Sequence, residues 1–298
     1  MGATKMPGLH ALWLSAAAPV ALSAVLAMPA EMTVAHRARS LQPGEVMLLT
    51  IASARPLREV RVEAFGRSFP CFETGDQRAW SSLVGIDLDT KPGRHVATVA
   101  GLDADGGTVT ADYPVTVAPK TFATRTLTVD PSFVSPPPEA LPRIQKESER
   151  VRAIFDAVSP ERYWSGPFGL PVPGRSISEF GKRSVYNGQP RSPHAGTDFA
   201  GATGTPIKAP NAGKVVLAGN LYYSGHTVIL DHGRGLYSYF GHLSALLARE
   251  GDTVGAGDVV GRLGATGLVT GPHLHWAVRL AGTRVDPLSL VHVLSAPR

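Results

Sequence analysis

Glycine and proline interrupt this chain so often that it has little room for long helices. The sequence contains 32 glycines and 25 prolines among 298 residues. Both residues favour turns, and proline also removes a backbone hydrogen-bond donor. Between them lie short apolar runs, several of which alternate with polar residues in the period-2 pattern of a half-buried strand. The sequence therefore predicts a mainly β protein.

Residues 1–35 differ in composition from the rest of the chain. From Leu9 to Ala30 the sequence is apolar, rich in alanine and free of Asp, Glu, Lys and Arg. This composition is typical of a secretory signal peptide, and we predict that the protein is exported. The run is also long enough to span a bilayer, so an uncleaved N-terminal anchor in the membrane is the alternative.

The net charge of +5 is distributed unevenly. Residues 1–165 contain 17 basic and 17 acidic side chains, whereas residues 166–298 contain 12 basic and 7 acidic ones. An exported basic domain is attracted to a polyanionic envelope or wall. Nucleic acid is not expected as a partner, because export argues against it and no recognition-helix or RNA-binding pattern is present. The single cysteine, Cys71, excludes an intrachain disulfide and is interpreted as a buried apolar residue.

Residues 36–118 are predicted to form an immunoglobulin-like β-sandwich, because short strands follow one another with turn signals between them. The predicted strands are 45–51, 60–65, 82–88, 95–99, 108–110 and 113–117. No catalytic constellation occurs among these residues. We expect this domain to act as a spacer or to dock onto a protein of the envelope.

Residues 119–165 are predicted to be a proline-rich and helical connector. The run from Ser135 to Pro138 favours a stiff, extended chain. Apolar side chains in residues 139–158 recur at the period of an amphipathic helix, which Pro160 should end. One hypothesis is that this connector lies across the groove of the site and restrains its activity.

Residues 166–298 combine further strands with residues that can bind a metal. His273 and His275 are two positions apart in a predicted strand, so their side chains should point to the same face. His194 and Asp198 add an imidazole and a carboxylate. Two imidazoles and one carboxylate are a sufficient ligand set for a catalytic zinc with an open fourth position. The ligand types alone leave other divalent ions possible.

The sequence of residues 166–298 gives less support to nucleotide binding, to a serine nucleophile or to a carrier domain. Residues 255–257 lack the Gly-Lys-Ser/Thr ending of a phosphate loop, and no Gly-x-Ser-x-Gly nucleophile turn is present. Residues 251–261 resemble the hairpin of biotinyl and lipoyl carriers, which need a lysine at the hairpin tip. Beyond Lys182 the only lysines are Lys208 and Lys214. A mass spectrum without a lysine adduct would dispose of the carrier hypothesis.

Three separated motifs carry a resemblance to a known family. Residues 193–198, 239–243 and 271–275 match, in order and spacing, the motifs of lysostaphin-type (LytM-like) zinc metallopeptidases. The resemblance covers about residues 166–291, and residues 180–188 resemble the opening of such a domain. Residues 36–118 also resemble the immunoglobulin-like module that precedes this domain in some exported bacterial members.

The resemblance implies a role for each matched residue. His194, Asp198 and His275 correspond to the ligands of one Zn²⁺ ion, and His242 and His273 correspond to the two catalytic histidines. We predict that His273 is the general base and His242 the oxyanion partner. Tyr239 is a candidate substrate contact, with packing at the rim as the alternative.

The family also implies a substrate and a compartment. Its members hydrolyse peptide bonds in the peptidoglycan of the bacterial cell wall, and residues 187–200 look more like the Gram-negative exported type. We therefore predict a periplasmic or envelope endopeptidase of stem peptides or cross-links, acting as a monomer. Some members have lost ligands and regulate other wall hydrolases, so a non-catalytic binding or regulatory module is the alternative function.

Overall fold

The computed structural model describes residues 1–2, 31–131 and 134–295, so most of the predicted leader lies outside the described residues. The described part is mainly β, as predicted, with two α-helices and one 3-10 helix beside its strands. Residues from Glu31 onward form one compact unit. No helix in the described ranges is long and apolar enough to cross a membrane.

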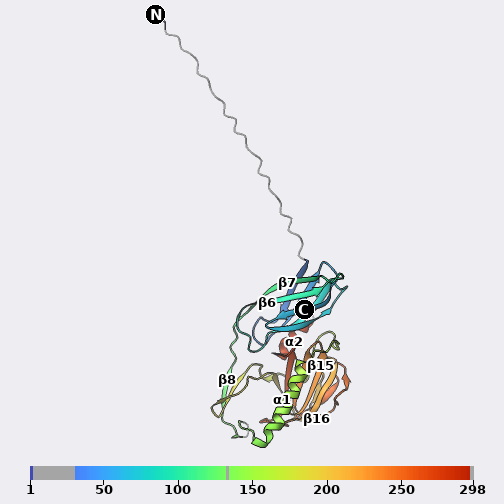
Figure 1. Ribbon diagram of the computed structural model, residues 1–298. Coiled ribbons are helices and arrows are strands. Elements are labelled where there is room, and N and C mark those ends of the chain that lie inside the picture. The colour runs from blue at the N-terminus through green and yellow to red at the C-terminus, as the bar shows by residue number, and fades with distance from the viewer. Residues whose placement is uncertain (3–30, 132–133, 296–298) are drawn as a thin grey trace. The chain divides into compact units, whose positions relative to one another are not determined.

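The first part of this unit is a seven-stranded antiparallel sheet (Figure 1). Its strands are β1 (Met32–Ala38), β2 (Val46–Ser53), β3 (Arg58–Ala64), β4 (Arg67–Glu73), β5 (Ala79–Gly85), β6 (Gly93–Leu102) and β7 (Thr108–Val117). The strand order is β1-β2-β5-β4-β3-β6-β7. β4 pairs with β5 in the group β1-β2-β5-β4 and with β3 in the group β3-β6-β7, so it joins the two groups. The predicted β-rich domain is thus present, while its immunoglobulin-like type stays a prediction.

Two of these strands were not predicted. β1 begins at Met32 and pairs with β2 along its whole length, so residues 32–35, which the sequence assigned to the leader, belong to the fold. Only Met32 of the seven residues of β1 is buried, which explains the weak apolar pattern. β4 contains Pro70, a residue that usually argues against a strand interior. Cys71 in β4 is buried, as predicted.

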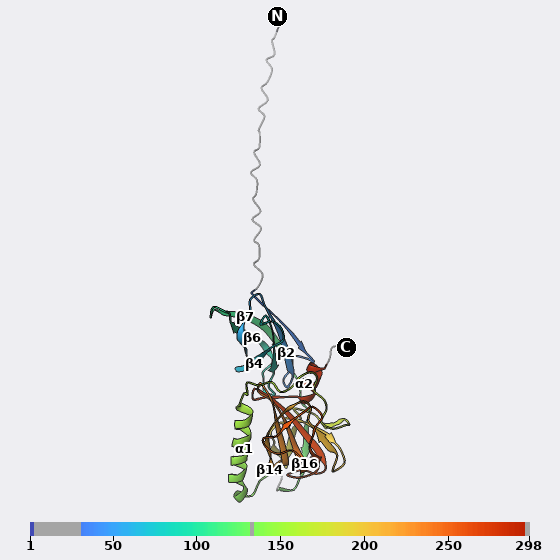
Figure 2. The same ribbon diagram turned by 90° about the vertical axis from the view of Figure 1, so that its right-hand side faces the viewer.

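The connector contains β8 (Thr124–Leu127), a 3-10 turn η2 (Pro138–Ala140) and α1 (Leu141–Asp156). α1 lies within the predicted residues 139–158. Its side chains Val151, Ile154 and Phe155 pack against Leu217, Ile229 and Tyr237 of the last part of the chain. α1 therefore lies along the sheet that contains β14 and β16 (Figure 2). The strand β8 pairs in parallel with β10 (Arg183–Tyr186).

The last part of the unit is built on a ten-stranded sheet with the order β17-β14-β15-β16-β19-β12-β9 and side pairings of β13, β18 and β20. Its elements are β9 (Ser176–Ser178), β12 (Thr197–Ala200), β13 (Pro206–Lys208), β14 (Gly213–Leu221), β15 (Gly225–Gly233), β16 (Leu236–Leu246), β17 (Thr253–Val254), β18 (Val259–Leu263), β19 (His273–Leu280) and β20 (Thr283–Val285). β10 and β11 (Gln189–Pro190) join β8 in a separate three-stranded sheet. A C-terminal helix, α2 (Pro287–Leu294), follows β20.

The helix α2 connects the last part of the chain to the first sheet. Asp286 caps the helix, because its carboxylate accepts a hydrogen bond from the backbone of Leu288 at 2.9 Å. The hydroxyl of Ser289 accepts a hydrogen bond from the backbone of Val46 in β2, also at 2.9 Å. Arg39 donates both to Glu45 (2.8 Å) and to Asp286 (2.6 Å). These contacts join α2 and its cap to the first sheet. The predicted domain boundaries at residues 118 and 166 stay a prediction.

Candidate active site

β19 positions the site because it lies between β12 and β16 in the sheet. In the register of these strands, His275 is directly opposite Asp198 on one side and Gly241 on the other. Along β19 itself, Leu274, Trp276 and Val278 are buried in the core. The intervening residues, which include His273, His275 and Arg279, therefore point to the opposite face.

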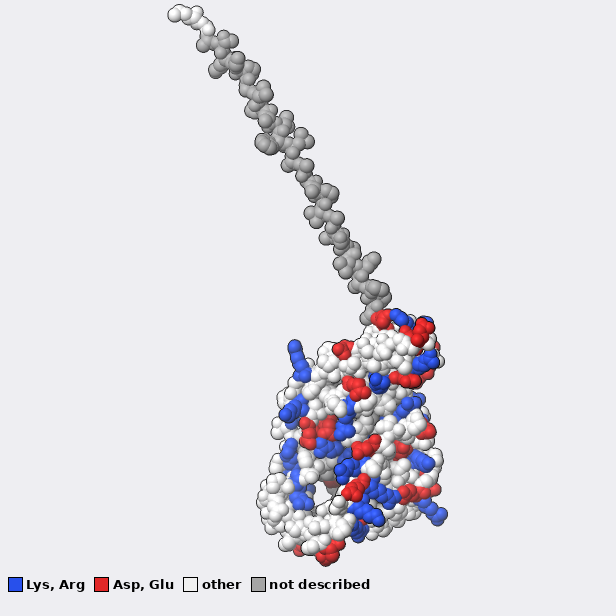
Figure 3. All heavy atoms as spheres, viewed as in Figure 1, with Lys and Arg blue, Asp and Glu red and all other residues white. Residues whose placement is uncertain are grey.

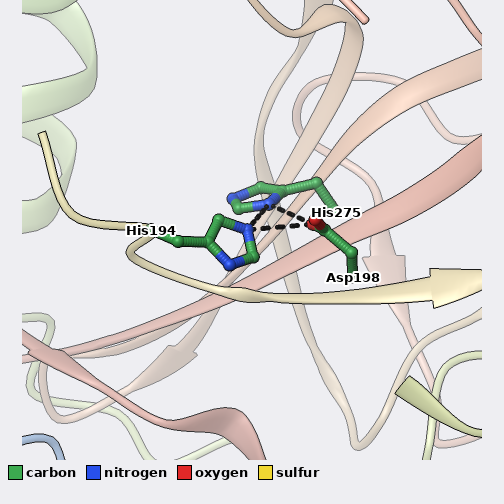
Figure 4. A group of neighbouring side chains, drawn as sticks. All are labelled: His194, Asp198 and His275. Atoms are coloured by element: carbon green, nitrogen blue, oxygen red, sulfur yellow. Dashed lines mark hydrogen bonds and ion pairs between the residues drawn. The ribbon is translucent and has the colours of Figure 1, made fainter. Parts of the chain in front are cut away.

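His194, Asp198 and His275 converge on one point (Figure 4). Oδ1 of Asp198 lies 2.9 Å from Nε2 of His194 and 2.9 Å from Nδ1 of His275. The two imidazole nitrogens are 3.0 Å apart. The structure thus brings together the three residues that were predicted as metal ligands.

The surroundings orient these groups as a metal site requires. Nδ1 of His194 donates a hydrogen bond to the carbonyl oxygen of Glu179 at 3.0 Å, so Nε2 is the nitrogen directed at Asp198 and His275. Nε2 donates to Asp198 when the ring is protonated and can bind a metal once that proton is lost. Metal-binding histidines commonly donate their second ring N–H in this way. Gly196 leaves the room for the ring of His275, because a Cβ at this position would lie 2.6 Å from it. The two nitrogens and the carboxylate oxygen fit a divalent ion such as zinc.

The electrostatics of the group favour an ionised carboxylate. Burial alone would raise the pKa of Asp198, but hydrogen bonds from His194 and His275 hold it well below its usual range. Burial also opposes charge on His194, yet Asp198 raises the pKa of this imidazole. Burial lowers the pKa of His275. The site therefore holds a fixed negative charge that attracts a cation.

His242 and His273 lie beside the three ligands. The ring centroids of His242 and His273 are 4.8 Å apart, and Nε2 of His273 is 3.9 Å from Oδ1 of Asp198. Nδ1 of His242 donates to the carbonyl of Thr266 (3.0 Å), and Nδ1 of His273 donates to that of Gly271 (2.9 Å). In the neutral state, each ring therefore keeps Nε2 as a proton acceptor.

The position of His242 carries two further signs of a functional residue. Its φ is +67°, a left-handed conformation that residues other than glycine rarely adopt and that often occurs at functional sites. Burial, followed by the charge of His275, lowers the pKa of His242 to about 4. A neutral ring is therefore favoured at neutral pH.

The five residues open onto a cavity of about 660 Å³. Tyr239 lines it, but its hydroxyl donates to Ser224 Oγ at 2.5 Å, and its ring centroid lies 6.1 Å from that of His275. The connector also lines the cavity, through residues of β8 and through Val151 and Phe155 of α1. The connector is therefore placed beside the site, as the hypothesis requires, whereas a restraint on activity stays a prediction.

Three arginines in the cavity wall were not assigned from the sequence. Arg125, Arg191 and Arg279 all line the cavity. A signal existed for Arg279, since it follows His273 and His275 at even spacing along one strand and so shares their face. Arg125 lies far from the histidine motifs in sequence, and the pairing of β8 with β10 brings it to the site. Arg191 lies only three residues before His194, but no pattern in the sequence singled it out.

Comparisons with known proteins agree on one family. The profile of peptidase family M23 matches residues 192–287. Over 115 residues the chain is 38% identical to the peptidoglycan DD-endopeptidase ShyA of Vibrio cholerae, a match that covers 38% of this chain and 27% of the relative. Over 97 residues it is 39% identical to the DD-carboxypeptidase/endopeptidase Mpg of Neisseria meningitidis, covering 33% of this chain and 22% of the relative. These matches span about a quarter of the length of the curated relatives.

One solved structure matches over a much longer stretch. A crystal structure described as a peptidase M23 of Pseudomonas aeruginosa is 34% identical in sequence, with a TM-score of 0.66. The superposition covers 85% of this chain and 95% of that one. The likeness thus extends well beyond residues 192–287.

Proposed function

The chain belongs to peptidase family M23, and we propose on this basis that it is a zinc-dependent endopeptidase that hydrolyses stem peptides or cross-links of peptidoglycan. The observation that carries the proposal is the convergence of His194, Asp198 and His275 beside two further histidines. The names of the relatives support the substrate, since ShyA is a peptidoglycan DD-endopeptidase.

In this proposal His194, Asp198 and His275 hold one zinc ion. When bound, zinc polarises a scissile carbonyl and lowers the pKa of an attacking water. Asp198 supplies the anionic ligand, because its carboxyl stays ionised over the whole neutral range. The hydrogen bond from His194 to Glu179 holds the first imidazole in the ligating tautomer.

His273 and His242 perform the proton transfers in the proposed reaction. His273 accepts a proton from the attacking water at Nε2, since its Nδ1 is already hydrogen-bonded to Gly271. His242 also presents Nε2 as an acceptor. A ring donates to the developing oxyanion only after it has taken up a proton, so the two rings are best regarded as a pair that shares this proton. Tyr239 is proposed to contact the substrate from the cavity wall.

The alternative function is a non-catalytic module that binds the wall or regulates another hydrolase. It predicts that one or more of the ligand or catalytic positions is lost. All five residues are present and face one cavity, which favours the enzyme.

The proposed compartment is the periplasm or cell envelope. The composition of residues 1–35 supports export, through a cleaved signal peptide or an anchor in the inner membrane. The basic excess in residues 166–298 suits a polyanionic wall. We propose that the protein acts as a monomer and that the first sheet docks onto an envelope protein.

The test is a digestion of purified sacculi with protein that lacks residues 1–30, with and without a chelator. Products are identified by mass spectrometry. Release of new peptide termini that stops on chelation and returns with zinc is the expected result, and the termini identify the bond. Sacculi that bind the protein but release no peptides would favour the non-catalytic module.

A further inference from the structure

The guanidinium of Arg279 lies at the wall of the active-site cavity without an acidic partner. Its Nη1 donates to the carbonyl oxygens of Ala195 (3.2 Å) and Val278 (3.3 Å), and no ion pair of the described residues includes it. A guanidinium has five N–H donors, so these two bonds leave Nε and Nη2 unused among the described residues. Ala195 directly follows the predicted zinc ligand His194, which places Arg279 next to the reaction centre.

Aromatic packing fixes the plane of this guanidinium. Cζ of Arg279 lies 5.2 Å from the ring centroid of Phe155 on α1. Such a cation–π contact holds the group in place without consuming its hydrogen-bond donors. Burial lowers the pKa of Arg279 to about 10, so the side chain stays charged at neutral pH. Burying a charged guanidinium without an acidic partner costs free energy, and binding of an anion would offset that cost.

The charges that line the whole cavity also favour binding of an anion. Arg125 donates to Ser184 Oγ and to the hydroxyl of Tyr186, and Arg191 donates to the carbonyl of Val134. None of the three arginines is in an ion pair within the described ranges. Among the lining residues that the structure describes, Asp198, the predicted zinc ligand, is the one acid. In Figure 3 the surface is hollowed beside the segment that carries β8, and basic side chains border the hollow.

Acidic side chains do occur in an adjoining hollow of about 390 Å³, which shares Arg279 and Phe155 with the cavity. Glu147 there pairs with Arg143 at 2.6 Å, and Asp156 lies outside ion-pair distance of Arg279. The acids on α1 therefore leave the charge of Arg279 available.

We propose that Arg279 binds a free carboxylate of the substrate beside the scissile bond, and that the enzyme thereby selects carboxylate-bearing peptides over their amidated counterparts. The proposal rests on the function proposed above and assigns a specificity residue to it. The planar guanidinium can bind a carboxylate through two parallel hydrogen bonds, whereas a carboxamide offers one acceptor and no charge. Arg125, on the connector side of the cavity, adds positive potential that attracts the same substrates.

The test measures binding separately from hydrolysis. Two fluorescent peptides share one stem-peptide sequence and differ in a carboxylate or a carboxamide next to the scissile bond. Their dissociation constants are measured by anisotropy on the zinc-loaded protein that carries His273→Ala, which prevents turnover. We expect the carboxylate peptide to bind about 10- to 100-fold more tightly, as is typical of a hydrogen bond between charged groups.

Variants in the same background then assign the preference. Arg279→Gln should reduce it to less than about twofold, and Arg279→Lys should keep part of it, because lysine retains the charge without the planar fork. Arg150→Gln is the matched control, since Arg150 pairs with Glu250 on the exposed side of α1 and should leave the preference intact. Zinc content and thermal midpoint of each variant show whether its fold and metal site survive.

Two sets of outcomes separate this inference from the proposed function. Equal binding of the two peptides, binding of neither, or a preference that persists in Arg279→Gln would overturn the role of Arg279, even if the protein digests sacculi. If the preference disappears with Arg279→Gln while the unchanged protein, with His273 intact, releases no peptides from sacculi, the carboxylate site is supported and the endopeptidase is overturned. If Arg279→Gln does not fold, the comparison of the two peptides on the starting protein and on Arg279→Lys still decides the question.

Discussion

In the first sheet and in strand β19, side chains alternate between a buried face and an opposite face, but the opposite face differs in function between the two regions. In β6 of the first sheet, Ala97 and Val99 are fully buried and the intervening residues face outward, which yields a core and a solvated surface. In β19, Leu274, Trp276 and Val278 form the buried row, and the other row carries histidines and an arginine into a cavity. The periodicity thus indicates the fold in both regions, but only the residue types in the second row indicate a function.

The comparison predicts that the two regions respond differently to substitution. Changes in the second row of β12, β16 and β19 should remove chemistry and leave stability largely intact. Changes in the buried row of the first sheet should remove stability and leave chemistry intact. The predictions below test this division, beginning with the largest expected effect.

Asp198→Ala should abolish zinc binding and activity together, because the predicted zinc site then keeps two imidazoles and lacks its only anionic ligand. Zinc per chain is measured by mass spectrometry of the metal, and activity by peptide release from sacculi. Asp112→Ala is the matched control, since this carboxylate accepts a hydrogen bond from Thr98 in the first sheet. Stoichiometric zinc in Asp198→Ala would contradict the ligand assignment.

His242→Ala should retain zinc and lose roughly 10²- to 10⁴-fold in kcat, the usual contribution of a positioned proton-transfer group. Zinc content and kcat are measured on the same preparation. The control is His292→Ala, which changes an exposed histidine on α2. If His242→Ala lost zinc as severely as His275→Ala, the division into ligands and catalytic residues would be wrong.

Phe69→Ala in β4 should lower the free energy of unfolding by roughly 3–5 kcal/mol, because Phe69 is fully buried and a cavity would replace its ring. Urea unfolding followed by tryptophan fluorescence gives the stability. At temperatures where the variant stays folded, zinc content and kcat should equal those of the unchanged protein. A loss of zinc in the folded variant would show that the two regions are less separate than proposed.

Arg39→Met should destabilise the protein by roughly 2 kcal/mol at pH 7, a moderate value because Arg39 is one-third exposed and Lys120 still contacts Glu45. Burial favours a raised pKa for Glu45, but Arg39 holds it below the usual value. A depressed carboxyl pKa contributes stability above the unfolded value of about 4.3 and loses it as the pH falls through the folded pKa. The difference between the two proteins should therefore shrink on acidification from pH 7 to pH 3, as urea unfolding can measure. A difference independent of pH would exclude Glu45 as its source.

Asn187→Gly should have the smallest effect and tests the connector. The side chain of Asn187 exchanges two hydrogen bonds of 2.9 Å with the backbone of Val129, which lines the cavity. Glycine tolerates the local φ of +50°, so the substitution removes these exposed bonds with little strain, at a cost of about 0.5 kcal/mol each. If the connector restrains the site, turnover on sacculi should rise severalfold. Unchanged turnover in a variant whose free energy of unfolding has fallen would argue against a restraint.

Local spacing predicted most of the strands, whereas the five residues predicted for the site came from the resemblance to lysostaphin-type peptidases. Alternation places His273 and His275 on one face, and the motifs around His194 and His242 supplied their partners. Several elements escaped this reasoning, and for β1, β4 and α2 the physical reason is plain. β1 follows directly on an apolar leader, β4 contains a proline, and α2 is only eight residues long.

Arg279 and the connector illustrate a different limit. An arginine near the end of a strand usually extends into solvent, and only the packing of α1 covers this one with Phe155. Likewise, the parallel pairing of β8 with β10 joins segments about sixty residues apart, which no local pattern indicates. Both features are tertiary, and both determine what can enter the cavity.

The docking of α2 on the first sheet has a consequence for how the chain acquires its structure. The backbone N–H of Val46 donates to Ser289 Oγ, and Arg37 donates to the carbonyl of Val293 at 2.6 Å, so these contacts join residues 243 and 256 positions apart in the chain. Contacts of such sequence separation slow folding and couple it across the chain. The first sheet therefore gains its full set of contacts only when α2 has packed against it. Heating should then melt both sheets in a single calorimetric transition.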